Sequence, residues 1–253
     1  MWFNQLMESC KRATRLLWSR PGLLLPWLLG IIALGGATVV LAIIGVILAI
    51  PLIIVAFQGG LPFLMLGLLL IGGGIAILMA LLWSTFYAGY IAMLQGALAG
   101  EASLSDGFWR GVRTLTWKMW STNLLLILVI ILSSPLLVLA YLLAGAVSLL
   151  SGGVALIALN LLWFVFLHPW PVVVAAESKG GFFPLRESLR MGRERFALMF
   201  LLALTSSALP MMALNLGPLG FLLAGWLVGI VVTTWLRLVV ILEYHSWKQS
   251  SWL

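Results

Sequence analysis

Charged and uncharged residues occupy separate blocks along this chain. All fourteen basic and all seven acidic residues fall in four short stretches, residues 1–20, 101–118, 177–195 and 237–248. The three tracts between them, residues 21–100, 119–176 and 196–236, are uncharged and mostly apolar. Uncharged apolar runs of 18 or more residues are typical of membrane helices. Because lipid offers no hydrogen bonds to the backbone, spans are either helices or a closed barrel. Barrel strands would alternate polar and apolar residues, whereas these runs are apolar on every face, so we predict helices. The pattern therefore predicts an all-α, polytopic membrane protein.

The number of predicted spans follows from the positions of the lysines and arginines. These residues mark the cytoplasmic side because their translocation is unfavourable. Each uncharged tract must then leave the cytoplasm and return, which requires an even number of spans. At about 20 residues per span, each tract is expected to hold two. We therefore predict six transmembrane helices in the cytoplasmic (inner) cell membrane, with both termini in the cytoplasm.

Helix breakers mark the predicted external turns, which lie near residues 58–62, 148–153 and 215–218. The predicted spans are 22–49, 63–97, 122–146, 154–176, 197–214 and 219–244. Two alternatives stay open in the first tract: Pro51 ends the first span early, or the glycines at 72–74 kink the second. The apolar run after Pro21 exceeds the ~7–15-residue core of a signal peptide, so we expect a retained span.

The charged stretches have a helical pattern of their own. Apolar or small residues recur at helical spacing in three sets: Leu6, Cys10, Ala13 and Leu17; Phe108, Val112, Leu115 and Met119; Leu185, Leu189, Gly192 and Phe196. This pattern predicts amphipathic helices that lie in the membrane interface. A capping box at residues 103–106 and Pro184 would begin the second and third. The single membrane domain, 1–253, then contains three units, 1–100, 101–176 and 177–253, each an interfacial helix followed by a hairpin.

Basic side chains of these helices are the candidate binding residues. They are Lys11, Arg110, Arg113, Arg186, Arg190 and Arg193. Each basic residue near an acidic lipid surface contributes on the order of 1 kcal/mol. We therefore expect membrane lipid, with anionic headgroups, or a partner subunit or second copy of the chain at the cytoplasmic face. The alternative is that these residues only set the topology.

A second candidate site is a polar pocket formed by His168, Glu177 and Arg237. Prolines on both sides of Trp170 free backbone carbonyls beside a titratable imidazole. Arg237 is predicted to pair with Glu177 or Glu187. The alternative is that His168 and Trp170 are anchors at the level of the headgroups.

Composition and motifs point away from catalysis. The chain is 63% hydrophobic and 8% charged, with a mean hydropathy of +1.18. It has no phosphate-binding loop, nucleophile elbow, zinc-protease motif or Cys/His cluster. We therefore predict a non-enzyme without a cofactor, metal or nucleic-acid partner, and with no disulfide at Cys10. The alternatives are a transporter or permease subunit for a lipid-like substrate, with a path near His168, Gln95 and Asn160, and a lipid-modifying enzyme that uses His168 and Glu177.

Two segments resemble a bacterial membrane-protein family. In residues 168–196 a span ends at a proline, Glu177 and a glycine follow, and an amphipathic helix with Ser188 leads into the next span. Residues 104–113 are similar to that family's second interfacial helix. The family is the glycerophosphoryl diester phosphodiesterase membrane domain with its uncharacterised six-span relatives. The resemblance implies a six-helix membrane domain, in some members fused to a soluble phosphodiesterase domain. It transfers no catalytic or binding residue to this chain.

Overall fold

The computed structural model describes residues 2–59, 61–147, 165–214 and 226–250. Every regular element in these ranges is a helix. In chain order they are α1 (Trp2–Ser19), the 3-10 helix η1 (Pro21–Leu24), α2 (Leu25–Gly59), α3 (Leu61–Leu98), α4 (Leu104–Val147), α6 (Trp170–Glu177), α7 (Phe182–Glu194), α8 (Phe196–Leu214) and α10 (Trp226–Ser250). The all-α prediction is confirmed for this part of the chain.

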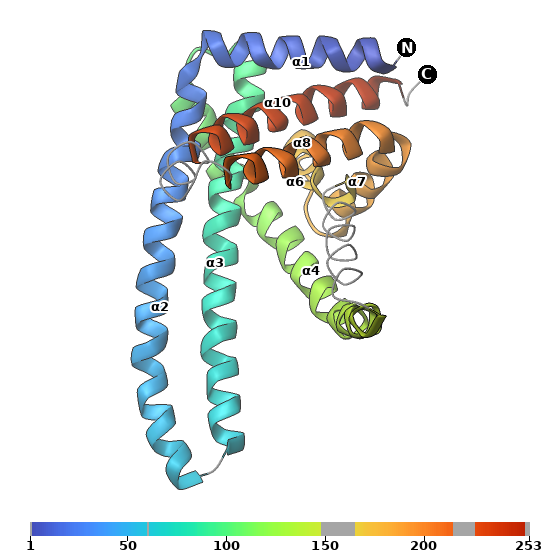
Figure 1. The fold of residues 1–253 in the computed structure, drawn as a ribbon. Coiled ribbons are helices and arrows are strands. Elements are labelled where there is room, and N and C mark those ends of the chain that lie inside the picture. Colours follow the sequence, from blue (N-terminus) through green and yellow to red (C-terminus); the bar gives the residue numbers. More distant parts are fainter. Residues whose placement is uncertain (1, 60, 148–164, 215–225, 251–253) are drawn as a thin grey trace.

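Helices α2 and α3 form a long antiparallel hairpin that projects from the rest of the molecule (Figure 1). Two segments in it, Pro21–Pro51 and Met65–Leu98, are long and apolar enough to cross a membrane by length and composition. Large apolar side chains of the hairpin, such as Ile43, Ile54 and Leu70, are exposed. A helix that is hydrophobic on all sides requires an apolar surrounding. The hairpin is therefore the part of the fold that fits lipid best.

The part of α3 that precedes its first residue described as buried is about as long as a bilayer core is thick. Counted from the turn, Ala80 is the first α3 residue described as buried. At a rise of about 1.5 Å per residue, residues 61–79 extend about 28 Å. The hydrocarbon core of a bilayer measures about 30 Å. From Ala80 to its C-terminal end, α3 packs against α4, α6 and α10. We call this part of the molecule, together with α1 and α7, the head.

The turn predicted near residues 58–62 is confirmed, because α2 ends at Gly59 and α3 begins at Leu61. Helix α2 continues through Pro51, while the segment that is long and apolar enough to cross a membrane ends at this proline, so an early end of the first span stays a prediction. Similarly, α3 remains one helix through the glycines at 72–74. A helix end within lipid would leave backbone groups without partners, which favours continuing the helix despite these residues.

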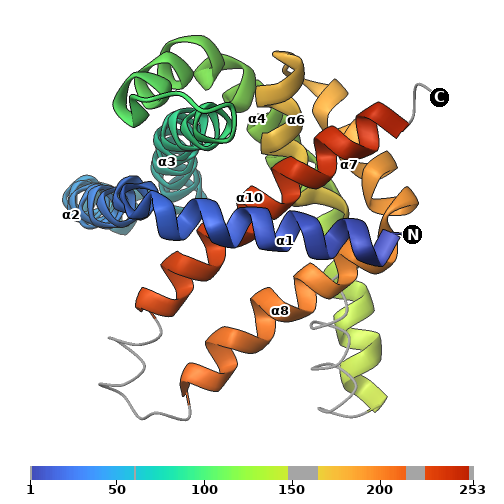
Figure 2. The ribbon, with the colours of Figure 1, turned by 90° about the horizontal axis from the view of Figure 1, so that it is seen from above.

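One projecting hairpin, rather than three, is visible in the described residues. Helices α8 and α10 lie across the axis of the α2–α3 hairpin (Figures 1 and 2). Helix α4 joins the second predicted interfacial helix to the third predicted span without interruption, because residues 112–134 contain no proline or glycine. The predicted turns at 148–153 and 215–218 lie outside the described residues. Six spans therefore stay a prediction.

The three amphipathic segments are helical, but their apolar stripes pack on the head itself. Leu6 and Ala13 of α1 and Met119 of α4 are buried in one core with α3, α6 and α10. On α7, Leu185 is buried and Leu189 is 45% exposed. The stripes were predicted to face lipid; most of their residues instead cover the core, because the buried end of α3 and α10 supply closer apolar partners.

Predicted helix starts agree with the structure. The main-chain nitrogen of Asp106 lies 3.3 Å from the Ser103 hydroxyl, which caps the first turn of α4. Pro184 lies in the first turn of α7, where its missing N–H has no helical partner to lose.

Close packing of α3 on α4 depends on Gly111. A Cβ atom at this position would lie 2.3 Å from the carbonyl oxygen of Ala88 and 2.5 Å from the Ala92 Cβ. We expect Gly111→Ala to lower the free energy of unfolding by about 1–3 kcal/mol, as overpacking does. Thermal unfolding in detergent measures this. The matched control is Gly73→Ala, where nothing lies within 4 Å. Equal midpoints for the two variants would contradict the prediction.

Candidate functional site

The charged stretches of the sequence meet at the end of the molecule opposite the hairpin turn (Figure 1). We call this surface, formed by α1, the start of α4, α7 and the second half of α10, the charged end. Gln5 of α1 hydrogen-bonds to Ser246 of α10. Arg20 donates from Nη1 to the carbonyl oxygen of Glu101 at 2.6 Å, which ties α1 to the segment before α4. Stretches far apart in the sequence thus form one surface.

Buried charge on α10 joins three of these helices. The Glu243 side chain is fully buried and accepts a hydrogen bond of 2.7 Å from the Ser9 hydroxyl of α1. Its Oε2 lies 3.7 Å from Nη1 of Arg195, between α7 and α8. Burial, followed by the charge of Glu243, raises the pKa of the nearby Cys10 thiol. Cys10, the one cysteine of the chain, is therefore a neutral packing residue.

Lys248 of α10 holds two carboxylates. Its Nζ lies 3.1 Å from Oε1 of Glu177 and 3.7 Å from Oε2 of Glu187. Burial alone would raise the pKa of Glu177, but hydrogen bonds from Lys248 and from the Tyr244 hydroxyl outweigh it, and the pKa lies below its usual range. The predicted pairing of Arg237 with Glu177 or Glu187 is wrong. Lys248, about three helical turns further along α10, reaches the level of these carboxylates.

Arg237 lies instead beside His168. Its Nη1 donates to the His168 carbonyl oxygen at 2.9 Å, and its Nη2 donates to the Tyr87 hydroxyl at 3.0 Å. Arg237 and His168 line a cavity of about 240 Å³ together with Asn123 and Trp170. The structure thus brings together two members of the predicted polar pocket. Glu177 does not line this cavity.

Two of the six predicted basic binding residues are held in ion pairs. Nη2 of Arg110 lies 2.7 Å from both carboxylate oxygens of Glu101. Nε of Arg190 lies 3.0 Å from Glu194, and its guanidinium sits 5.6 Å from the Trp247 ring centroid. These pairs are largely exposed, so each is expected to add little stability.

The other four predicted basic residues point outward. Lys11, Arg113, Arg186 and Arg193 are exposed, and no ion pair in the described part of the chain involves them. They lie on α1, α4 and α7, so the structure does not gather the six into one site. Their shared property is access to whatever lies against the charged end.

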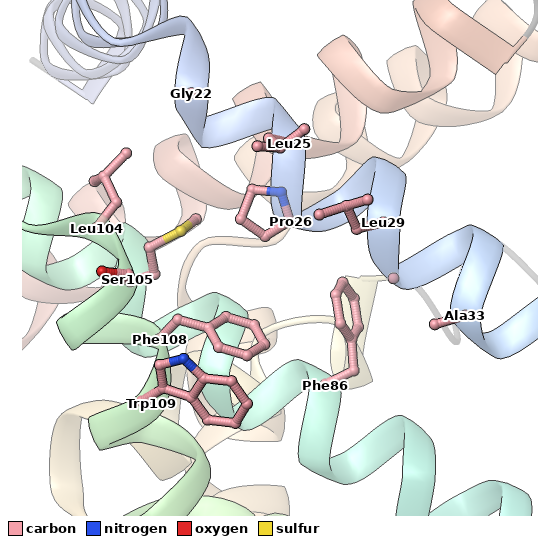
Figure 3. Close-up of a pocket in the computed structure, with 12 residues that line it drawn as sticks. Gly22, Leu25, Pro26, Leu29, Ala33, Phe86, Leu104, Ser105, Phe108 and Trp109 are labelled. Atoms are coloured by element: carbon pink, nitrogen blue, oxygen red, sulfur yellow. The ribbon is translucent and has the colours of Figure 1, made fainter.

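An apolar groove lies at the base of the hairpin, where α2 and α3 enter the head. It has a volume of about 540 Å³ and is lined mainly by apolar residues of η1, α2, α3 and α4. Figure 3 shows side chains of Pro26, Phe86, Phe108 and Trp109 directed toward the same space. The polar side-chain groups in the lining are the Ser105 hydroxyl and the Trp109 indole N–H. We call this feature the apolar groove.

Exposed tryptophans mark the level of the apolar groove. Trp18 is 84% exposed, and Trp109, which lines the groove, is 58% exposed. Such side chains are enriched where a membrane protein meets the headgroups, because the ring is apolar and its N–H is polar. The groove therefore lies between the exposed hairpin and the charged end.

A third cavity, of about 510 Å³ and with a polar lining, lies between α3, α4 and the end of α6. Its lining includes Gln95, Arg110, Thr114, Lys118 and Ser178. Gln95 and His168, which were predicted to share a transport path, line different pockets. Asn160, the third residue of that path, lies outside the described residues. In the described ranges, no group of three or more His, Cys, Asp or Glu side chains could hold a metal ion.

Neither the apolar groove nor the role of Lys248 was predicted from the sequence. The groove-lining residues come from segments near positions 22–33, 86–93 and 104–109, each of which resembles ordinary core sequence. Only the packing of α2 and α4 against α3 brings them together. The Trp109 side chain was a usable signal, since a large aromatic residue beside Arg110 is typical of an interface.

Comparisons with protein-family models, with curated proteins and with solved structures found no match. The resemblance of residues 168–196 to the phosphodiesterase membrane-domain family therefore stays a prediction.

The Glu177 carboxylate gives a pH-dependent prediction. Its pKa is lower in the folded protein than the value near 4.3 expected when unfolded. Its contribution to stability is therefore complete above that value and is lost as the pH falls through the folded pKa. We expect Glu177→Gln to lower the thermal midpoint at pH 7 and to weaken its decline below about pH 4.3. The control is Glu8→Gln, an exposed residue of α1. Identical pH profiles for wild type and Glu177→Gln would disprove this role.

Proposed function

We propose that this protein is a non-catalytic integral membrane protein that holds an anionic lipid at the cytoplasmic face. An acyl chain lies in the apolar groove, and basic side chains beside the groove hold the headgroup. The observation that carries the proposal is the position of the groove, at the base of an exposed apolar hairpin and next to the charged end. A lipid is the ligand whose two chemistries match these two surroundings.

The apolar groove suits an acyl chain in size and lining. Pockets that bind small molecules usually measure about 300–1,000 Å³, and this groove measures about 540 Å³. The walls formed by Leu29, Phe86 and Phe108 offer dispersion contacts without hydrogen-bond partners. A soluble polar ligand would lose its hydration there without compensation.

Selectivity for one lipid must come from the headgroup. An acyl chain that enters the groove leaves one apolar surrounding for another, so the hydrophobic effect adds little to the preference. Arg113 follows Trp109 by four residues and so shares its face of α4. Arg20 precedes the groove-lining Gly22 by two residues. Both place positive charge next to the groove.

The other three exposed members of the predicted basic set strengthen the attraction to an acidic surface. Lys11, Arg186 and Arg193 lie at the same charged end but away from the groove lining. On the order of 1 kcal/mol per residue is expected from such cations near anionic lipid. These three cations favour an orientation in which the charged end faces the anionic headgroups. Arg113 and Arg20, which lie next to the groove, give the selectivity for one lipid headgroup over another.

The topology that accompanies this function is six spans with both termini in the cytoplasm. Three uncharged tracts separated by one-sided charge support it. Helices α2 and α3 fit spans by length and composition, and α8 contains no charged residue. A two-span protein, with α8 and α10 lying at the interface, is the arrangement that the experiment must distinguish.

Lipid retention tests the proposed function. We expect the purified protein to retain phosphatidylglycerol over phosphatidylcholine from mixed vesicles, and Arg113→Gln to reduce this preference about five-fold, as loss of on the order of 1 kcal/mol predicts. Lipid analysis after extraction in mild detergent measures the ratio. Arg12→Gln, an exposed basic residue of α1 further from the groove, is the charge-matched control.

A second variant separates the groove from the charge. Ala33→Phe places a ring in the groove lining and should lower retention of both lipids without changing their ratio. Equal loss of preference in Arg113→Gln and Arg12→Gln would show general surface charge instead of a site and would refute the proposal.

Cysteine accessibility tests the topology. In a Cys10→Ser background, we expect single cysteines at Gln58, Ser148 and Asn215 to react with a membrane-impermeant maleimide from outside the cell. A cysteine at Glu8 should react only after permeabilisation, since α1 is expected in the cytoplasm. External labelling at Gln58 alone would favour two spans over six.

A further inference from the structure

Arg237 is a buried cation whose hydrogen-bond partners are neutral. Arg237 is only 6% exposed to solvent, and its guanidinium donates to the His168 carbonyl and to the Tyr87 hydroxyl. The guanidinium also lies 5.1 Å from the centroid of the Tyr87 ring. An arginine has five N–H donors, and two are used here. The Nε atom is buried and has no hydrogen-bond partner.

No acidic side chain neutralises this charge. All seven acidic residues lie in the described part of the chain. Their ion pairs there are formed with Arg110, Arg190, Arg195 and Lys248. Removing a cation from water is unfavourable unless an opposite charge replaces the lost hydration. The position of Arg237 therefore calls for an anion from outside the chain.

Space for that anion lies next to Arg237. The cavity of about 240 Å³ has aromatic walls formed by Trp83, Tyr87 and Trp170. The Asn123 amide, 3.2 Å from the Ser84 hydroxyl, adds a polar group to the lining. No acidic residue lines the cavity. Apolar walls strengthen the attraction between the arginine and an anion, because they exclude water.

We propose that this cavity binds a phosphate-type oxyanion, with Arg237 as its charge partner. The planar guanidinium presents paired N–H groups that match two oxygens of a phosphate or phosphodiester. The cavity volume admits a headgroup or a small phosphate ester and excludes an acyl chain beside it. The occupant is thus inorganic phosphate, a soluble phosphate ester, or the phosphodiester of a lipid that enters headgroup first.

This oxyanion site is separate from the apolar groove. Phe86 lines the groove and the next residue, Tyr87, lines the cavity, so the two sites lie on different faces of α3. The site does not depend on the proposed lipid retention. A variant that fills the groove, Ala33→Phe, is expected to leave binding at Arg237 unchanged.

Thermal unfolding in a neutral detergent tests the site. Sodium phosphate is titrated against sodium chloride at equal ionic strength. We expect the midpoint of the wild-type protein to rise with phosphate concentration, because a ligand that binds only the folded state stabilises it. Arg237→Gln should abolish the rise, and Arg15→Gln, an exposed arginine of α1, should retain it. Equilibrium dialysis with radiolabelled phosphate should give one site per chain in the wild type.

A second, cavity-filling variant tests the site even if Arg237→Gln fails to fold. Leu126→Trp adds volume to the lining of the cavity and removes neither of the two hydrogen bonds of Arg237. We expect it to weaken phosphate binding by ten-fold or more while near-ultraviolet circular dichroism shows a folded protein. Unchanged binding in a folded Leu126→Trp would overturn the proposal.

The source of the oxyanion is distinguished in a second arm. The same variants are unfolded in nanodiscs of phosphatidylcholine with and without phosphatidylglycerol. Stabilisation by phosphatidylglycerol that requires Arg237, without an effect of free phosphate, would support the lipid phosphodiester as the ligand. If neither anion stabilises the wild type more than Arg237→Gln, Arg237 is only a link between α10, α3 and α6, and the proposal fails.

Discussion

The charged half of α10 connects helices that are distant in the sequence. Glu243 bonds to Ser9 of α1 and lies near Arg195, while Lys248 lies between Glu177 of α6 and Glu187 of α7. Each contact involves a charge that is at least partly removed from water. The head can pack stably only if the partner lies close enough to offset this loss of hydration. Without these contacts, α1, α6 and α7 would be held to α10 by apolar packing and by hydrogen bonds such as Gln5–Ser246 and Trp247–Glu194, and apolar packing specifies relative positions less strictly.

The head in turn determines where the hairpin becomes exposed. Helix α3 is covered above Ala80 by α4, α6 and α10, and its lower part has α2 as its main neighbour. The apolar groove lies at this transition, because η1 turns the chain from α1 into α2 and leaves a space bounded by Phe86 and Phe108. The exposed apolar hairpin and the charged end therefore meet at one level of the molecule. The proposed lipid site and the oxyanion cavity both lie near it, on different faces of α3.

Sequence reasoning reached the features that depend on local chemistry. Charge placement and helix breakers predicted the α2–α3 hairpin and its turn, and Ser103 and Pro184 predicted helix starts. Contacts that depend on the register between packed helices were not predicted correctly. From the sequence alone, Arg237 and Lys248 are equally plausible ion-pair partners for Glu177. The packing of α10 against α6 determines that Lys248 is the partner. The apolar groove likewise has no local signature, since its walls are ordinary core residues. The other two hairpins stay a prediction.

The uninterrupted course of α4 has a mechanical consequence. The 3-10 helix η1, which begins with Pro21 and Gly22, separates α1 from α2, so a change in the angle between these two helices breaks neither α-helix. Helix α4 has no such joint between Gly111 and Pro135. A tilt of the apolar half of α4 is therefore carried to Arg110, which pairs with Glu101 at the charged end, because no joint between the two absorbs it. Helix α4 is thus a rigid arm that couples its apolar half to the charged end, whereas α1 and α2 meet at a turn.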